Sequence, residues 1–385
     1  MTFRSMEKYH SVTHRGHSPI TIDPPSGTSL HPFADRKAMY GCRKLSLSAL
    51  LAATLSMLAA PAPAAADKTP VLGIVAIDLQ NSFFVRMRQA GDEAAKDYGV
   101  KTIWQGSEGS LEKQVSNIEN FVNQGVDIIL VDPLDRAAIA SAVQKAKARG
   151  IPVIAMGNKV DGHWNYNTLY PDYPNMSMVA RALGKQLDGK GEVALLIGGK
   201  GNHVSDTREQ AFRDVMKKEF PGIRLVGVEP TNWDSSRSAN AMQTWLSTYP
   251  QLRGVGCFAD SICIAAKAIA DASGRKLVFA SYEGDPEMFP SVADGSTVID
   301  VLNGAYRVGY WNIAAAARIV RGAKYGVDLF MPTYFVMSDK TAGALKAKGL
   351  ELPFITPERA KVEALNYRAQ MGPGQPDSAL SVGGQ

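Results

Sequence analysis

The feature that most constrains the fold is a regular alternation of short β-branched runs with longer amphipathic stretches, from Pro70 to Val336. The run Val71–Ile77 predicts a strand. The apolar residues after it recur at helical spacing, at Phe84, Met87, Gly91, Ala94 and Tyr98. Alternating strands and helices form parallel sheets with helices on both faces. We therefore predict an α/β fold of doubly wound parallel sheets.

The alternation forms two series, separated by the Tyr- and Pro-rich stretch Tyr166–Pro174. The first series continues through the predicted elements Lys101–Trp104, Leu111–Gly125, Asp127–Val131, Arg136–Arg149 and Pro152–Met156. The second series comprises Met176–Leu187, Val193–Ile197, Thr207–Glu219, Leu225–Val228, Ser236–Tyr249, Gly254–Phe258, Ser261–Ser273, Lys276–Ala280, Pro286–Asp294, Ser296–Val301, Tyr306–Arg321 and Tyr334–Val336. Two series predict two sheets, and hence two lobes.

The N-terminal part does not follow this pattern. Residues 1–38 have no apolar period, and from Met39 a basic pair precedes the apolar run Leu45–Leu58 and an Ala-x-Ala site before Asp67. This order is typical of a secretory signal peptide, and the run is shorter than the roughly 20 residues of a membrane-spanning helix. We predict that residues 39–66 are a cleaved signal peptide, with Met39 as the start, so that the protein reaches the periplasm without stable membrane insertion.

The charge of the exported part argues against nucleic-acid binding. The whole chain has a formal charge of +5, but residues 1–66 carry seven Lys or Arg and three Asp or Glu. Residues 67–385 therefore have a charge near +1. Nucleic-acid binding requires a basic excess, which is absent here.

Two cysteines remain after cleavage, Cys257 in a predicted strand and Cys263 in a predicted helix. The periplasm permits a disulfide, but the spacing fits two buried thiols equally well, so both alternatives stay open. Two Cys without a nearby His pair do not form a zinc site.

The sequence also lacks the glycine-rich phosphate-binding motifs and a nucleophile elbow. We therefore expect no metal, no cofactor and no enzymatic activity.

The loop after the first predicted strand carries the strongest functional signal. On the residues alone, Asn81 or Ser82 could simply cap the next helix, with the following Phe pair in the core. However, Asn81-Ser82-Phe83-Phe84 resembles the Asn-Pro-Phe-Phe signature of the ribose-binding family of periplasmic proteins, relatives of the effector domain of LacI-type repressors. The resemblance extends to Gly125–Pro133, to Gly150–Ile154 and to the order of elements. A repressor is excluded because a leader precedes Val71 in place of a helix-turn-helix.

The resemblance implies a type I periplasmic binding protein, the substrate-binding component of an ABC transporter, in which two lobes joined by three crossings close on a ligand. We expect crossings near Asp172, Asp300 and Met331. The expected segments are an N-terminal lobe of residues 67–172 plus 301–331, a C-terminal lobe of residues 173–300 plus 332–370, and a disordered tail of residues 371–385.

The resemblance also implies the ligand contacts. Asn81, Phe83 and Phe84 would line the cleft, with the rings stacked on the C–H faces of a sugar. Arg208, in a segment similar to the family's Arg-x-x-Gly-Phe element, would donate two hydrogen bonds to the ligand. Trp233 would provide the opposite aromatic face.

Other positions depart from the family pattern. Glu283 replaces a shorter acid that accepts sugar hydroxyls, and Asn158 follows Gly157 where the family has Asp-Arg. Asp300 stands near a family Gln and is also a candidate contact. Asp260 is interpreted as a helix cap, although a ligand contact remains the alternative. Trp164, Tyr166 and Tyr170 either rim the cleft or pack the hinge.

The predicted pocket thus has two acids, Glu283 and Asp300, against one base, Arg208. This balance argues against sugar acids and phosphates. We expect a monomer that binds a small neutral sugar or polyol and delivers it to an ABC permease. A cationic amine remains an alternative ligand, and presentation to a chemoreceptor or kinase remains an alternative to transport.

Overall fold

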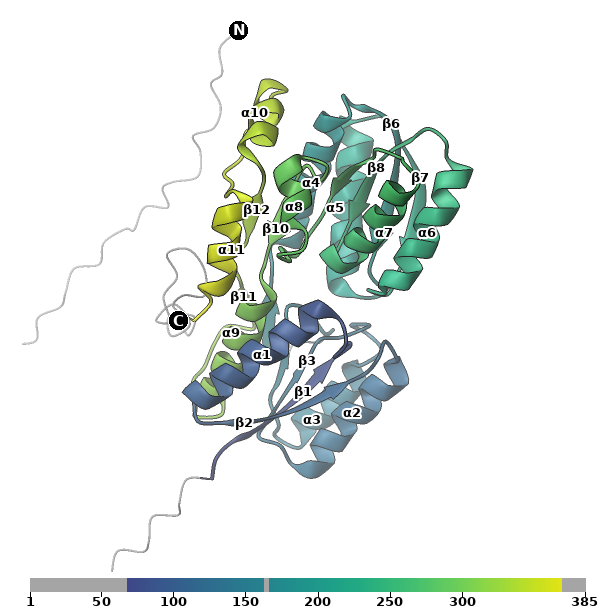
Figure 1. Cartoon of the computed structure of the whole chain (residues 1–385). Coiled ribbons are helices and arrows are strands. Elements are labelled where there is room, and N and C mark those ends of the chain that lie inside the picture. The colour runs from purple at the N-terminus through teal and green to yellow at the C-terminus, as the bar shows by residue number, and fades with distance from the viewer. Residues whose placement is uncertain (1–67, 163–165, 369–385) are drawn as a thin grey trace, which may run out of the picture. The chain divides into compact units, whose positions relative to one another are not determined.

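The computed structural model describes residues 68–162 and 166–368 (Figure 1). The predicted signal peptide (39–66), Trp164 and the predicted tail (371–385) lie outside the described residues.

The first sheet has six parallel strands in the order β11-β5-β4-β3-β1-β2. Its strands are β1 (Val71–Ala76), β2 (Lys101–Gly106), β3 (Ile128–Val131), β4 (Val153–Ala155), β5 (Tyr166–Leu169) and β11 (Asp328–Phe330). Helices α1 (Ser82–Asp97) and α9 (Ala305–Ile319) pack together, as do α2 (Leu111–Gln124) and α3 (Ala140–Ala148). We call this sheet with its four helices the N-lobe.

The two faces of β1 explain this arrangement. Leu72 and Ile74 belong to the apolar cluster formed with α1 and α9, whereas Val75 belongs to the cluster formed with α2 and α3. Such alternation is the period of a strand covered on both sides. The close approach of α9 to α1 requires Gly309, because a Cβ there would lie 1.9 Å from the backbone oxygen of Met87.

The second sheet has four parallel strands in the order β7-β6-β8-β9. They are β6 (Lys190–Ile197), β7 (Gly222–Pro230), β8 (Leu252–Cys257) and β9 (Val278–Ala280). Its helices are α4 (Asp172–Gln186), α5 (His203–Glu219), α6 (Ser235–Thr248), α7 (Asp260–Ala272) and α8 (Phe289–Asp294), of which α4 packs on α5 and α6 on α7. We call this sheet with its helices the C-lobe.

The chain passes between the lobes at three places: between β5 and α4, between β10 (Asp300–Leu302) and α9, and between β11 and β12 (Tyr334–Val336). Strands β10 and β12 pair antiparallel as a small sheet of their own. Helices α10 (Asp339–Ala347) and α11 (Pro357–Leu365) follow and contact α4, α8 and α9. The residue boundaries predicted for the lobes stay a prediction.

The predicted fold class is confirmed, but several element predictions need correction. Helix α3 begins at Ala140 rather than Arg136, because Asp135 Oδ1 accepts the N–H groups of Ala137 and Ala138 and forms a turn first. Only the end of the predicted strand Ser296–Val301 pairs as β10. Strands β5 and β11 and helices α10 and α11 were not predicted.

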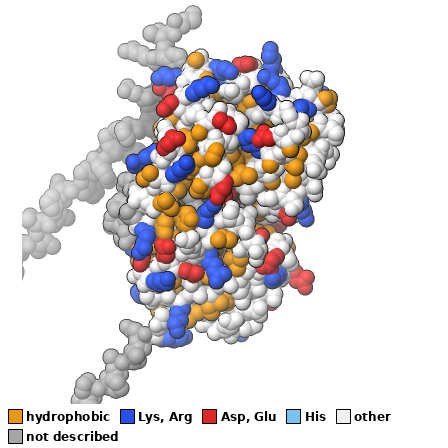
Figure 2. Space-filling view, in the orientation of Figure 1, with side chains coloured by type: hydrophobic (Ala, Val, Ile, Leu, Met, Phe, Trp, Pro, Cys, Tyr) orange, Lys and Arg blue, Asp and Glu red, His pale blue; other side chains and the backbone are white. Residues whose placement is uncertain are grey.

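On the face drawn in Figure 2, basic and acidic side chains are interspersed and neither sign forms a continuous patch. Within the described residues, no helix combines the length and the apolar character needed to cross a bilayer.

Candidate ligand-binding site

A cavity of about 50 Å³ lies where loops at the carboxyl ends of strands from both lobes meet. Loops from the carboxyl edge of parallel sheets form the binding sites of most open α/β folds. Seven of the eight residues predicted from the sequence line this cavity: Asn81, Phe83, Phe84, Asn158, Arg208, Trp233 and Glu283. Asp300 does not.

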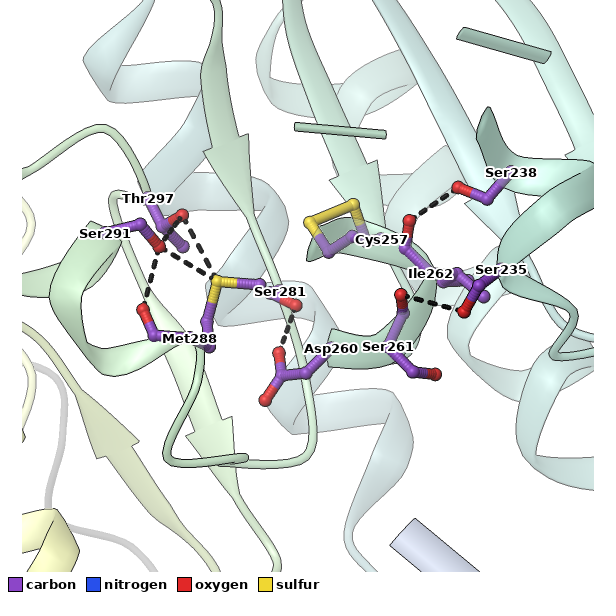
Figure 3. Close-up of a disulfide and its surroundings, with 11 residues drawn as sticks. Ser235, Ser238, Cys257, Asp260, Ser261, Ile262, Ser281, Met288, Ser291 and Thr297 are labelled. Carbon is purple, nitrogen blue, oxygen red and sulfur yellow. Dashed lines mark hydrogen bonds between the residues drawn. A yellow bond between two sulfur atoms is a disulfide. The ribbon is translucent and has the colours of Figure 1, made fainter. Parts of the chain in front are cut away.

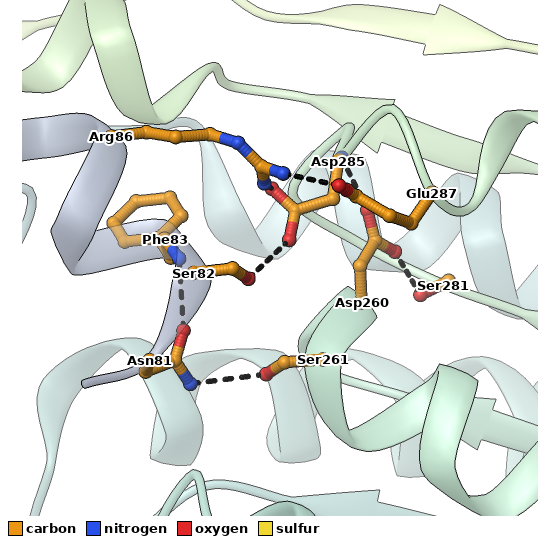
Figure 4. A network of polar contacts seen from close by, with 9 residues as sticks. All are labelled: Asn81, Ser82, Phe83, Arg86, Asp260, Ser261, Ser281, Asp285 and Glu287. Atoms are coloured by element: carbon orange, nitrogen blue, oxygen red, sulfur yellow. Dashed lines mark hydrogen bonds and ion pairs between the residues drawn. The ribbon is translucent and has the colours of Figure 1, made fainter.

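Asn81 both caps helix α1 and lines the cavity. Its Oδ1 accepts the backbone N–H of Phe83 at 2.9 Å, and its Nδ2 donates to Ser261 Oγ of the C-lobe at 3.3 Å (Figure 4). The cap fixes the start of α1, which carries Phe83 and Phe84 in an edge-to-face pair with centroids 5.5 Å apart. The two interpretations of this loop are therefore compatible.

Arg208 is held by three groups of the protein. Its Nε donates to Asp172 Oδ1 at 2.8 Å, its Nη1 donates to the carbonyl of Phe258 at 2.5 Å, and its guanidinium lies 3.5 Å from the ring centroid of Tyr282. Among the described residues, none accepts a hydrogen bond from Nη2. The side chain is thus preorganised, with one nitrogen left for a ligand.

Trp233 is set by an unusual backbone. Its φ of +66° follows a φ of +54° at Asn232, and its N–H donates to Thr231 Oγ1 at 3.1 Å. Gly198 makes room for the indole, because a Cβ there would lie 2.2 Å from the ring. The indole packs against the apolar clusters of both lobes, so it bridges the cleft.

Glu283 follows β9 and has a φ of +125°. Its N–H donates to the carbonyl of Val301 at 2.8 Å, which ties it to β10. Burial raises the pKa of the Glu283 carboxyl well above its ordinary value; the charge of Asp285 adds to this shift and that of Arg208 opposes it. Hydrogen bonds donated by the hydroxyls of a ligand would stabilise the charged form of this buried carboxyl group.

Two acidic residues lie elsewhere than expected. Asp300 is fully buried in β10, where its Oδ1 accepts the N–H of Val301 at 2.7 Å, and burial raises its pKa to about 7. Asp260 is not the cap of α7, since Ala259 takes that position. Its carboxylate turns to the loop after β9 instead, where it accepts from the Ser281 hydroxyl and, at 2.7 Å, from the N–H of Asp285.

Sequence reasoning missed four polar residues that line the cavity: Asp132, Asn202, Ser261 and Asn303. Tyr170, which was expected either to rim the cleft or to pack the hinge, also lies on the cavity wall. Asp132 directly follows β3, and Ser261 lies in the first turn of α7, just after the end of β8. The rule that strand ends carry the site could have found both. Tyr170 follows β5, which was not predicted. Asn303 takes the place at the cavity that was expected for Asp300.

A second set of contacts joins the lobes outside the cavity (Figure 4). Arg86 of α1 forms ion pairs with Asp285 at 2.8 Å and with Glu287 at 2.5 Å, and Ser82 Oγ donates to Asp285 at 3.2 Å. None of these four residues lines the cavity. We call Ser82, Arg86, Asp285 and Glu287 the interlobe clasp.

Cys257 and Cys263 form a disulfide with a Cα–Cα distance of 5.4 Å (Figure 3). It closes the turn between β8 and α7, which brings Ala259 and Ser261 to the cavity. Ser235 Oγ holds the same turn by donating to the carbonyl of Ser261 at 3.1 Å. Within residues 68–162 and 166–368, no cluster of three potential metal ligands occurs.

A cavity between two doubly wound lobes joined by three crossings is the architecture of the type I periplasmic binding proteins. The family model described as "Periplasmic binding protein domain" matches residues 72–324, more than half of the chain. The protein belongs to this family.

Named relatives agree with this assignment. The chain is 26% identical over 300 residues to the ribose import binding protein of Bacillus subtilis, covering 77% of this chain and 97% of the relative. It is 26% identical over 273 residues to the xylitol-binding protein of Mycolicibacterium smegmatis, covering 69% of this chain and 76% of the relative. An ABC transporter solute-binding protein from Bacillus halodurans with bound myo-inositol has the same fold, with a TM-score of 0.66, 21% identity and coverage of 73% of this chain and 98% of that one.

Proposed function

We propose that this protein is a periplasmic solute-binding protein that captures a small neutral sugar or polyol between its lobes and delivers it to an ABC importer. The observation that carries the proposal is a single cavity to which the N-lobe contributes Phe83 and Phe84 and the C-lobe contributes Trp233, Arg208 and Glu283. Aromatic faces suit the C–H surfaces of a sugar ring, and the polar side chains suit its hydroxyls.

The proposed contacts are the seven predicted residues that line the cavity, without Asp300. Closing the lobes would exclude water, which otherwise competes for these hydrogen bonds. The relatives support the ligand class, since two of them are named for ribose import and for xylitol binding. The family and the predicted signal peptide support the periplasm as the location, the ABC permease as the partner, and binding without catalysis.

A thermal-shift screen of the exported chain tests this function. The panel contains the neutral compounds D-ribose, D-allose, xylitol and myo-inositol, with D-glucuronate and D-glucose 6-phosphate as anionic controls. A ligand that binds only the folded state raises the melting temperature. We expect a shift with at least one neutral compound and none with the anions. If no neutral compound raised the melting temperature, or if only the anionic compounds did, the result would contradict the proposal.

A further inference from the structure

After the third crossing, the chain first packs on the C-lobe. Leu345 of α10 belongs to one apolar cluster of the C-lobe, and Ala360 and Ala364 of α11 belong to the other. Between the two helices, the N–H of Ile355 donates to the carbonyl of Phe335 in β12 at 2.9 Å. The chain is therefore anchored on the C-lobe and on β12 as far as Ala364.

Three residues further on, the chain packs on the N-lobe. Tyr367 is 7% exposed and belongs to the apolar cluster of α1 and α9. Its ring stacks on that of Tyr306 with centroids 5.4 Å apart, and its carbonyl accepts from Trp311 Nε1 at 2.7 Å. Helix α11 itself lies beside α9 (Figure 1). The chain thus passes from one lobe to the other between Ala364 and Tyr367.

Polar contacts hold the same end of the chain on α1. The hydroxyl of Tyr367 donates to Glu93 at 2.6 Å. The guanidinium of Arg368 donates to both carboxylate oxygens of Asp97, at 2.7 and 2.9 Å. Glu93 and Asp97 lie one turn apart on the second half of α1. The interlobe clasp holds the other end of α1, so this helix is tied to the C-lobe at both ends.

We call residues 366–368 the C-terminal latch, because they form a fourth link between the lobes. Its hold on the N-lobe consists of noncovalent contacts, which can break and re-form. The lobes are closed here, touching through the clasp and through the N–H of Arg136, which donates to the carbonyl of Gly201 at 3.1 Å. From Ala364 to Tyr367 the chain can reach at most about 11 Å. Lobe movement beyond that reach has to pull Tyr367 out of its site.

We propose that the C-terminal latch favours the closed arrangement of the lobes, because wide opening costs the contacts of Tyr367 and Arg368 with the N-lobe. The inference goes beyond the proposed function, since the latch acts on the hinge movement and not on the ligand. The match to the family model ends at residue 324, before α10, α11 and the latch. A ligand that binds the closed form gains affinity with the population of that form, so the latch should strengthen binding.

Distances between two spin labels on the full exported chain, measured by double electron–electron resonance without ligand, test the latch. The labels are attached at Asn123→Cys in α2 and Gln243→Cys in α6, two exposed positions on the side of their lobes away from α11 (Figure 1). Tyr367→Ala removes the ring and its hydrogen bond to Glu93. We expect this variant to raise the ratio of long to short label distances about fivefold. Arg368→Ala should change the ratio in the same direction by less.

Ligand affinity gives a second measurement on the unlabelled chain. Isothermal titration calorimetry uses D-ribose, D-allose, xylitol and myo-inositol as probes. A probe that binds the wild type should bind Tyr367→Ala about fivefold more weakly, with a smaller loss in Arg368→Ala. Neither residue lines the cavity, so a loss of affinity reports the population of the closed form and not a lost contact with the probe.

Two variants of the same C-terminal segment are the matched controls. Phe354→Ala removes a partly buried ring that packs on a C-lobe cluster. Lys346→Ala removes an exposed base whose ion pair with Glu351, at 2.7 Å, lies within this segment. Both variants should keep the wild-type label distances and affinities, even where the lost ring lowers the melting temperature. A merely structural role of the segment would instead give the same changes in the controls as in the latch variants.

The outcomes separate this inference from the proposed function. Unchanged label distances in the latch variants, or equal changes in Phe354→Ala, would overturn the latch and leave the function standing. Wild-type affinity in Tyr367→Ala for a probe that binds would overturn the latch as well. A shift in the distances of ligand-free Tyr367→Ala, with no neutral probe bound by the wild type, would support the latch and overturn the function. The Arg368 side chain is 54% exposed, so Arg368→Ala decides the matter if Tyr367→Ala does not fold.

Discussion

Arg208 Nε donates to Asp172 Oδ1 at 2.8 Å, and the two side chains are 2% and 3% exposed. Asp172 is the first residue of α4, directly after the first crossing between the lobes, and Arg208 lies in α5 on the cavity wall. The ion pair therefore connects a crossing segment to a proposed ligand contact.

We predict that Asp172→Asn destabilises the protein and weakens ligand binding. The substitution leaves a buried guanidinium without a carboxylate, which typically costs about 3–5 kcal/mol in the free energy of unfolding. Urea denaturation measures this change. The control is Glu219→Gln, which breaks the more exposed pair with Arg181 in the same lobe and should cost about 1 kcal/mol or less. Equal losses in the two variants would contradict the structural role of Asp172.

Trp233→Ala should strongly weaken binding of the neutral ligand without unfolding the chain. The indole lies on the cavity wall and packs against both lobes, so its removal deletes the aromatic surface that the C-lobe contributes to the cavity. Aromatic truncation at such sites costs about 2 kcal/mol or more, which is roughly a thirtyfold loss of affinity. The matched control is Phe330→Ala, at a side chain that is 60% exposed and outside the cavity. Wild-type affinity in Trp233→Ala would be inconsistent with the proposed site.

The interlobe clasp should control how long the ligand stays bound. Arg86→Ala removes both ion pairs to the C-lobe without altering the cavity wall, so the closed form should open faster. A loss of about 1 kcal/mol corresponds to a roughly fivefold faster dissociation. Stopped-flow tryptophan fluorescence measures the rate. Arg88→Ala is the control, because Arg88 pairs with Asp92 within α1; equal dissociation rates in the two variants would refute the clasp.

The stability of the empty protein should fall as pH rises from 5 to 8. Burial raises the pKa values of Asp132 and Asp300 to about 7, above the ordinary value of 3.8 that the unfolded chain retains. The folded state thus binds these protons more tightly, and its stability is lost as pH rises through about 7. Calorimetry across this range should give a falling melting temperature, with a flatter profile in Asp300→Asn. A melting temperature that rises with pH would contradict this account.

The strand and helix periods were sufficient to predict the two sheets and the loops at their strand ends. The choice of Phe83, Trp233 and Glu283 within these loops came from the resemblance to the ribose-binding family. Strands β5 and β11 were missed because each is short and pairs at or near the edge of its sheet, where side-chain pattern is weak. Asp300 was chosen because it stands near a family Gln, and Asn303 was missed because no local signal shows which residue of a strand end turns toward the cavity.

Sequence patterns could not predict contacts between residues that are far apart in the chain. The pair Arg208–Asp172 spans 36 residues and the clasp contact Arg86–Asp285 spans 199. Each depends on how α1, α4 and α5 dock on their sheets, and amphipathic periodicity predicts which face of a helix is buried but not which partner it meets.

The most direct test of the central claim is a crystal structure of the exported protein grown with the neutral compound that gives the largest thermal shift. We predict ligand density between the rings of Phe84 and Trp233, with hydroxyls within hydrogen-bond distance of Arg208 Nη2 and the Glu283 carboxylate. Density for the ligand elsewhere on the protein, with the cavity between the lobes holding only water, would contradict the account.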